Sequence, residues 1–146
     1  MQVKERLLEA CRNILIDKKD HLFEAMDEAQ KSANDYGPPK DRYDSFRTQL
    51  LRKRDMFAQQ LAVANEQLKT LDKIDLQPVA KIGFGSLVVT DSQRIFIAIG
   101  LGKIKLDQEV YFAVSPVVPI ARELEGKEKG QSFSINGKTA KILEVW

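Results

Sequence analysis

The chain has 146 residues, with 23 basic and 21 acidic side chains and a formal net charge of +2 at pH 7. A chain of this length forms one or two small domains. The near balance of charge argues against wrapping of nucleic acid, because phosphate-driven binding requires a clustered basic face. No apolar run approaches the roughly 20 residues that cross a bilayer, and no apolar leader opens the chain. We therefore expect a cytoplasmic, monomeric protein without membrane contact.

Metal and redox chemistry have few side chains to use. Cys11 is the only cysteine and His21 the only histidine. This excludes an intrachain disulfide and a cysteine or histidine metal cluster, but not a carboxylate site. We expect Cys11 to be a small buried apolar residue, and we expect no cofactor of the protein's own.

The composition changes near Asp75, because seven of the eight glycines follow it. A charge-rich half that is poor in glycine, followed by a half punctuated by glycines, predicts helices first and a sheet second. We therefore place a helical domain at residues 1–74 and a β domain at residues 75–146.

Residues 3–34 carry the heptad stripe of a coiled-coil helix. Its apolar members are Leu8, Cys11, Leu15, Leu22, Ala25 and Ala29, with Lys18 and Ser32 as polar breaks. The neighbours Leu7, Ile14, Phe23 and Met26 widen the stripe, which predicts a further surface against this helix. The run Asn-Asp-Tyr-Gly-Pro-Pro at 34–39 then ends it, since glycine supplies a turn and proline suits the first turn of a new helix.

A second apolar seam follows the break. It consists of Tyr43, Phe46, Leu50, Phe57, Leu61, Ala64, Leu68 and Leu71. Two helices of similar length joined by a short turn bury such stripes by lying antiparallel. At 1.5 Å per residue, about 30 residues make a rod of roughly 45 Å. We expect the end of this hairpin to reach solvent or a partner.

The second half contains short apolar or alternating runs that predict strands at 79–82, 86–90, 94–99 and 109–114. Residues 120–125 predict a short helix. The runs 132–135 and 139–142 flank Asn136-Gly137, which is the preferred dipeptide of a type I′ hairpin turn. We expect an α+β protein, with an antiparallel helical hairpin followed by a small antiparallel sheet that carries one helix.

Several motifs resemble the Gre family of bacterial transcription elongation factors. They are Phe84-Gly85-Ser86 followed by alternating apolar residues, Ser115-Pro116, and the run Ile-Ala-Arg-Glu-Leu-Glu-Gly-Lys-Glu-Lys-Gly at 120–130. Ile74-Asp75 at the linker and Asp35 and Tyr43 near the break are also similar to the family. Each motif is weak alone, but together they cover most of the chain.

The resemblance implies an FKBP-like β domain that docks on RNA polymerase, with Ser115 and Pro116 in the docking loop. It implies a hairpin that enters the secondary channel and is in indirect contact with transcript RNA and DNA. In the family, two acidic residues at the hairpin end help to hold Mg²⁺ in the polymerase active site and stimulate transcript cleavage. The protein would then be an accessory factor rather than an enzyme.

The hairpin end departs from the family pattern. Asp35 matches the first acid, but the position of the second acid falls near Pro39 or Lys40. Asp41 and Asp44 are the remaining candidates, so the candidate catalytic residues are Asp35, Asp41 and Asp44, and the candidate ligands of the shared Mg²⁺ are Asp35 and Asp41. In the structural alternative, Asp41 and Asp44 complement the dipole in the early turns of the second helix, and Asp35 closes a turn. Cleavage stimulation and non-cleaving inhibition both stay open.

Four basic residues form a stretch below the hairpin end: Arg47, Arg52, Lys53 and Arg54. They are candidate contacts to the transcript or the channel walls, although such a run is also typical of a solvated helix face. Two further function classes are open. A prolyl isomerase would need an apolar aromatic pocket from Phe112, Phe133 and Trp146. A coiled-coil adaptor would dimerise through its seam.

Overall fold

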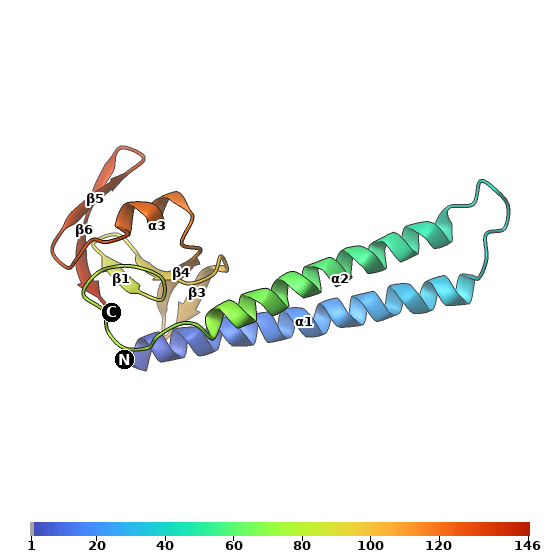
Figure 1. Cartoon of the computed structure of the whole chain (residues 1–146), viewed down its shortest axis with the longest axis horizontal. Coiled ribbons are helices and arrows are strands. Elements are labelled where there is room, and N and C mark those ends of the chain that lie inside the picture. Colours follow the sequence, from blue (N-terminus) through green and yellow to red (C-terminus); the bar gives the residue numbers. More distant parts are fainter. Residues whose placement is uncertain (1) are drawn as a thin grey trace. The chain divides into compact units, whose positions relative to one another are not determined.

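The computed structural model describes residues 2–146, and its helices and strands are drawn in Figure 1. The elements are α1 (Gln2–Tyr36), α2 (Phe46–Leu71), β1 (Leu87–Thr90), β2 (Arg94–Ile97), β3 (Gly102–Leu106), β4 (Glu109–Val114), α3 (Pro119–Leu124), β5 (Ser132–Ile135) and β6 (Lys138–Val145). The predicted class, a helical hairpin followed by a small β domain, is confirmed. Internal contacts divide the chain into a hairpin unit, Asn13–Lys69, and a β unit, which joins the residues up to Arg12 to Thr70–Trp146. The boundary placed at residue 74 from composition stays a prediction.

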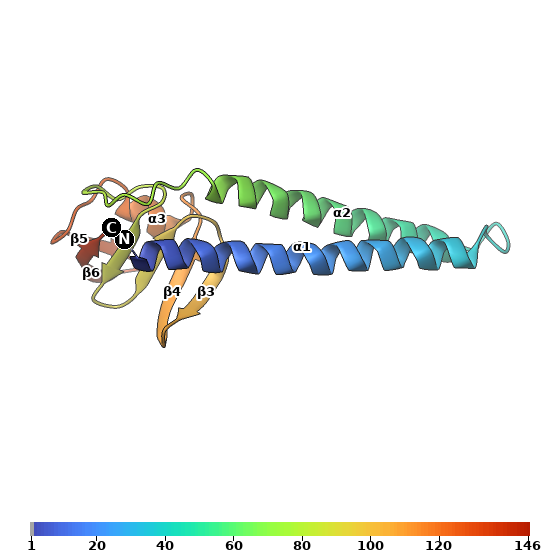
Figure 2. The ribbon, with the colours of Figure 1, turned by 90° about the horizontal axis from the view of Figure 1, so that it is seen from below.

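In the hairpin unit, α1 and α2 lie antiparallel and side by side (Figures 1 and 2). The seam predicted on α1 is buried at Leu15, Leu22 and Ala29. On the part of α2 in this unit, Ala64 is buried, and Leu50, Phe57, Leu61 and Leu68 are only half-buried. Leu71, the last seam residue, is buried in the β unit. The apolar stripe thus faces the other helix as predicted, but most of its large side chains on α2 stay partly exposed to solvent.

The start of the second helix differs from the prediction. Tyr43 and Phe46, assigned to the seam, are 79% and 51% exposed. Tyr43, Asp41 and Asp44 precede α2, which begins only at Phe46. The apolar stripe extends across this loop, so periodicity alone places the helix start too early, and a polar cap decides it instead. The adjacent prolines likewise lie in the loop and not in a first helical turn.

The β unit holds a six-stranded sheet in the order β3-β4-β2-β1-β6-β5. The sheet was expected to be antiparallel throughout, but β2 and β4 pair in parallel, with Ile95 opposite Phe112. Strand β3 lies between β2 and β4 in sequence. It pairs antiparallel with β4 at the edge of the sheet, so that β4 takes its place beside β2. The predicted type I′ turn is present, with φ of 53° at Asn136 and 77° at Gly137.

The strands differ from the prediction in two places: one predicted strand is absent, and one observed strand was not predicted. The run 79–82 forms only a single bridge, Lys81 to Glu128, because its apolar residues do not find a strand partner along their length. Strand β3 was missed, since its five residues alternate lysine with a single buried apolar residue, Ile104. It is joined to β4 by Asp107 and Gln108, which both have positive φ, the backbone of a tight hairpin turn.

One apolar core holds the sheet and α3 together. Its buried members are Ile82, Val88, Ile95, Ile97, Ala121, Leu124, Phe133 and Ile142. The helix predicted at 120–125 is confirmed, and it begins at Pro119, where the missing N–H of proline costs no helical bond. Gly85 has φ of +87°, and a Cβ there would lie 3.3 Å from Ile74 Cγ2, so this turn favours glycine.

Lys4 is a buried cation, which the sequence pattern does not predict. Its side chain is only 1% exposed, and Nζ donates to the backbone oxygens of Gln77 at 3.3 Å and Trp146 at 3.4 Å. Burial lowers the pKa of Lys4, and the charge of Asp75 partly offsets this. Lys4 thereby fixes the first turns of α1 within the β unit. None of the helices in residues 2–146 combines the length and the apolar character needed to span a membrane.

Candidate functional site

Asp44 closes the loop at the end of the hairpin. Its Oδ1 accepts a hydrogen bond from the backbone N–H of Phe46, the first residue of α2, at 3.1 Å. Its Oδ2 accepts from the backbone N–H of Lys40 at 2.8 Å and from the hydroxyl of Tyr36. These donors, with the Lys40 N–H contributing most, hold the pKa of Asp44 below its ordinary value. Asp44 therefore caps α2 and shapes the loop, which leaves its carboxylate little capacity for another ligand.

The other two candidate acids are less engaged. Asp41 Oδ1 accepts from the backbone N–H of Tyr43 at 2.7 Å, as in an Asx turn. Asp35 lies exposed in the last turn of α1 and makes no hydrogen bond or ion pair with any residue from 2 to 146. Of the three predicted acids, only Asp35 presents a carboxylate without any partner in the described chain.

Aromatic and cationic side chains complete the loop. The rings of Tyr36 and Phe46 pack with centroids 4.8 Å apart, so Tyr36 helps to close the hairpin. Lys40 Nζ lies 4.6 Å from the Tyr36 ring centroid, and the Arg42 guanidinium lies 4.7 Å from that of Tyr43. Cation–π contacts of this kind fix the side chains of both cations close to the loop. The hairpin end thus presents positive as well as negative groups.

The basic stretch on α2 does not form one face. Successive helical residues point about 100° apart, so Arg52, Lys53 and Arg54 diverge around the helix. Arg54 donates to Gln30 Oε1 on the other helix and pairs with Asp55 at 2.7 Å, which makes it a link between the helices. Arg52 is exposed. The role of these residues and of Arg47 in partner binding stays a prediction.

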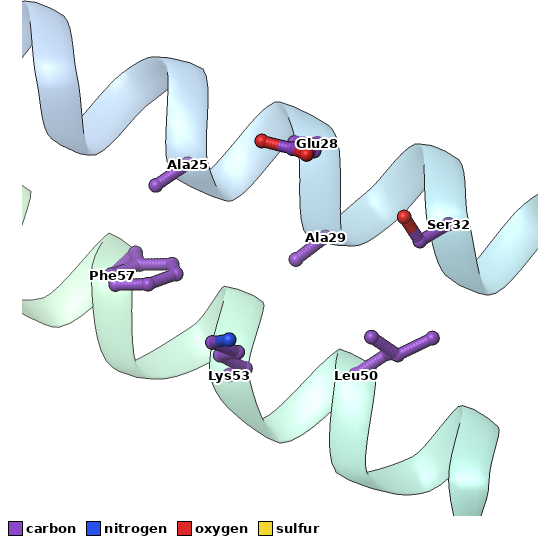
Figure 3. Close-up of a pocket in the computed structure, with 7 residues that line it drawn as sticks. All are labelled: Ala25, Glu28, Ala29, Ser32, Leu50, Lys53 and Phe57. Carbon is purple, nitrogen blue, oxygen red and sulfur yellow. The ribbon is translucent and has the colours of Figure 1, made fainter.

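Lys53 lines a groove between the two helices near the hairpin end (Figure 3). The groove has a volume of about 210 Å³, and its walls are Ala25, Glu28, Ala29 and Ser32 from α1 and Leu50, Lys53 and Phe57 from α2. It exists because α1 places small side chains opposite α2 along this stretch.

Ser115 and Pro116 form the turn between β4 and α3. The hydroxyl oxygen of Ser115 accepts from the backbone N–H of Val117 at 3.3 Å, which fixes the loop. Pro116 and Phe84 line one small hollow, and Phe84 and Val117 are 41% and 64% exposed. The family resemblance implies a docking loop at Ser115 and Pro116, but the sequence does not predict the exposure of Phe84 and Val117, because apolar alternation is typical of a half-buried strand.

The three aromatic residues considered for an isomerase pocket do not share the groove that Phe133 lines. That groove of the β unit has a volume of about 500 Å³, and neither Phe112 nor Trp146 lines it. Trp146 instead exchanges backbone hydrogen bonds with Leu87 at the end of the sheet. The isomerase alternative stays a prediction.

A magnesium site of the chain's own does not fit the residues present. Within residues 2–146, no three or more acidic, histidine or cysteine side chains gather closely enough to hold a metal ion. Mg²⁺ requires near-octahedral oxygen ligation, and Asp44 is already committed to three donors. Asp35 and Asp41 stay the candidates for an ion held mainly by a partner.

No protein-family model and no curated protein matches this chain. Among solved structures, the GreA factor homolog 1 (Gfh1) of Thermus thermophilus is similar, with 18% identity and a TM-score of 0.35 over 94% of this chain and 95% of that one. A second structure, of the transcription factor Gfh1, has 16% identity and the same TM-score over 93% of both chains. A likeness with so low a TM-score assigns no function to this chain.

Proposed function

We propose that this chain is an accessory factor of RNA polymerase that docks by its β domain, inserts its hairpin into the secondary channel and slows elongation without stimulating transcript cleavage. The resemblance of residues 84–89, 115–116 and 120–130 to the Gre family supports the polymerase as partner. These motifs fold together in the β unit as β1, the Ser115-Pro116 turn and α3.

The commitment of Asp44 to the loop is the observation that favours a non-cleaving role. Its three hydrogen bonds shape the loop and cap α2, so it is a structural residue. Lys40 stands near the position where the family has its second acid, and it lies over the ring of Tyr36. A cation there opposes binding of a second Mg²⁺, because like charges repel. Asp35 alone supplies too few oxygens for an ion that demands near-octahedral geometry.

The competing adaptor role uses a surface that is already occupied. Leu15, Leu22 and Ala29 are buried within the monomer, so the predicted seam is used inside the hairpin and is not free for a second chain.

The test is a backtracked elongation complex formed with the core RNA polymerase of the source organism. We expect the wild type to slow elongation and to leave the transcript uncut. Asp35→Asn and Asp41→Asn should behave like the wild type, because neither acid takes part in a metal site. Transcript length on a denaturing gel and the elongation rate are the measurements.

Two controls separate the parts of the proposal. Asp20→Asn makes the same chemical change on an exposed position of α1 away from the loop. Val117→Asp charges an exposed side chain of the proposed docking loop and should weaken polymerase binding with the fold intact. Cleavage by the wild type that either loop variant abolishes would overturn the non-cleaving role but leave the docking. A wild type that does not bind core polymerase would overturn the function as a whole.

A further inference from the structure

One side of the hairpin unit leaves large apolar side chains uncovered, and the groove of Figure 3 lies along it. Ile14 precedes Ser32 of the groove wall by eighteen residues, or five helical turns, so both point the same way from α1. On α2, Met56 lies three residues after Lys53 of the other wall, and Val63 lies seven residues after Met56. Ile14, Met56 and Val63 are 41%, 47% and 56% exposed. These three residues and the walls of the groove form the open face of the hairpin.

The opposite side of the hairpin is recognised by the link between Arg54 and Gln30. Met56 follows Arg54 by two residues and therefore points about 160° away from it. Phe23 lies seven residues before Gln30, on the same side of α1 as the link, and is 57% exposed. The hairpin thus has an exposed apolar residue on each side, but the groove lies only along the open face.

The two helices of the hairpin carry opposite net charge. Residues 13–36 of α1 contain six acidic and three basic side chains, and residues 46–69 of α2 contain five basic and two acidic ones. On the open face, Glu28 of α1 and Arg52 and Lys53 of α2 are exposed, and none of them forms an ion pair with any residue from 2 to 146. The open face therefore has an acidic border and a basic border whose charges are available to another molecule.

We infer that the open face is covered by a second copy of the hairpin in a reversible dimer. A two-fold axis along the hairpin lays α1 of each copy over α2 of the other, which places the acidic border of one on the basic border of the other. An axis across the hairpin would lay α1 over α1 and set like charges against each other. The charges therefore select the first arrangement.

In this arrangement each residue keeps its height along the hairpin. Glu28 and Lys53 line the same groove, so Glu28 of one copy meets Lys53 of the other. Ile14, Met56 and Val63 come together between the copies, and burying their exposed apolar surface favours association. The seam that joins α1 to α2 stays inside each copy, since the dimer uses only the side that the seam leaves open.

The dimer goes beyond the proposed function and differs from the monomer expected from the sequence. A hairpin covered by a second copy would be kept out of the secondary channel, a consequence that rests on the proposed function. The dimer itself does not depend on a polymerase. Its test contains none, so failure of the dimer and failure of the proposed function are distinguishable.

The experiment is sedimentation equilibrium of the full-length chain, from about 1 μM to about 1 mM. The average mass should rise with concentration from 16.6 kDa towards twice that value. Raising the salt from about 0.05 M to about 0.5 M should weaken the dimer, because salt screens the charges of exposed borders. Val63→Lys should weaken it by roughly tenfold or more, since it places two cations in the contact. Phe23→Lys is the matched control on the opposite side and should dimerise like the wild type, with circular dichroism checking that both variants keep their helices.

Exchange of charge tests which helix lies over which. Glu28→Lys and Lys53→Glu should each weaken self-association, because each sets like charges against each other in both contacts of the dimer. An equimolar mixture of the two variants should associate again, since both contacts of the mixed dimer then join a lysine to a glutamate. The inference is overturned if the wild type stays at 16.6 kDa throughout, if the dimer survives Val63→Lys or is lost equally in Phe23→Lys, or if the mixture does not associate.

Discussion

The hairpin unit and the β unit bury their apolar residues very differently. Within the hairpin unit, the buried apolar residues are Leu15, Leu22, Ala29, Ala33 and Ala64, three of them alanines. The β unit buries isoleucine, valine, leucine and phenylalanine from four strands, α3 and a loop in one core. Since burial stabilises roughly in proportion to apolar area, the β unit has its own source of stability, and the hairpin has much less.

The hairpin compensates with contacts at its end and along its length. Tyr36 packs on Phe46, Asp44 caps α2, and Arg54 bridges to Gln30. Small side chains leave the groove of Figure 3 between these links. Polar closure with a thin seam keeps this helix pair slender. The comparison predicts that the two units respond differently to the same kind of substitution.

The largest effect is expected from truncation in the core of the β unit. Ile142 is fully buried, and Ile142→Ala should destabilise by about 2–5 kcal/mol. Leu50 is half-buried beside an open groove, and Leu50→Ala should cost about 1 kcal/mol or less. Urea unfolding distinguishes them, because Trp146, the only tryptophan, reports the β unit by fluorescence, whereas circular dichroism at 222 nm reports mainly the hairpin.

Ile142→Ala should lower the urea midpoint of the fluorescence signal, and Leu50→Ala should lower only that of the helical signal. If each variant shifted both signals equally, the two units would unfold as one, and the contrast between their cores would not govern stability.

Local patterns predicted most of the elements, whereas pairing over long distances did not follow from them. The heptad stripe predicted the faces of Leu15 and Leu22, and Asn136-Gly137 predicted its turn. The parallel pairing of β2 with β4 and the edge position of β5 depend on which strands meet, and no local run of residues encodes this. The same limit explains the burial of Lys4, whose hydrogen-bond acceptors lie 73 and 142 residues away in sequence.

The hairpin end was only partly predictable. The resemblance to the Gre family made Asp35 a candidate as the match to the first acid, with Asp41 and Asp44 as the remaining candidates for the second. The sequence pattern placed two of them in a helix, since the apolar stripe continues through Tyr43 to Phe46. What separates the acids is hydrogen bonding. Three donors converge on Asp44, and none of the described residues contacts the carboxylate of Asp35.

Asp44 should make the hairpin sensitive to acid. Its folded-state pKa is lowered, so its contribution to stability is present above the unfolded pKa, near 4, and is lost as the pH falls through the folded value. The thermal midpoint of the helical signal should therefore fall between pH 6 and pH 3. Asp44→Asn should start from a lower midpoint and lose part of this pH dependence.

Asp35→Asn is the matched control, because it removes a loop carboxylate that has no partner in the described chain. It should keep the pH dependence of the wild type. Equal acid sensitivity in Asp44→Asn and the wild type would mean that other carboxylates control the loop.

The smallest expected effect is a change in the labelling rate of the Cys11 thiol, which reports on opening of the β unit. Burial raises the pKa of this thiol to about 11. Only the thiolate reacts with iodoacetamide, and Cys11 is also completely buried, so at pH 8 the folded protein should react more than roughly two hundredfold more slowly than a free cysteine. Cys11 belongs to the β unit, and its modification requires that unit to open. Ile142→Ala should therefore accelerate labelling, measured by mass spectrometry, whereas Leu50→Ala should leave the rate unchanged. If Leu50→Ala accelerated labelling to the same degree, loosening the hairpin unit would also open the β unit. The two units would then not be independently stable, contrary to the difference between their cores.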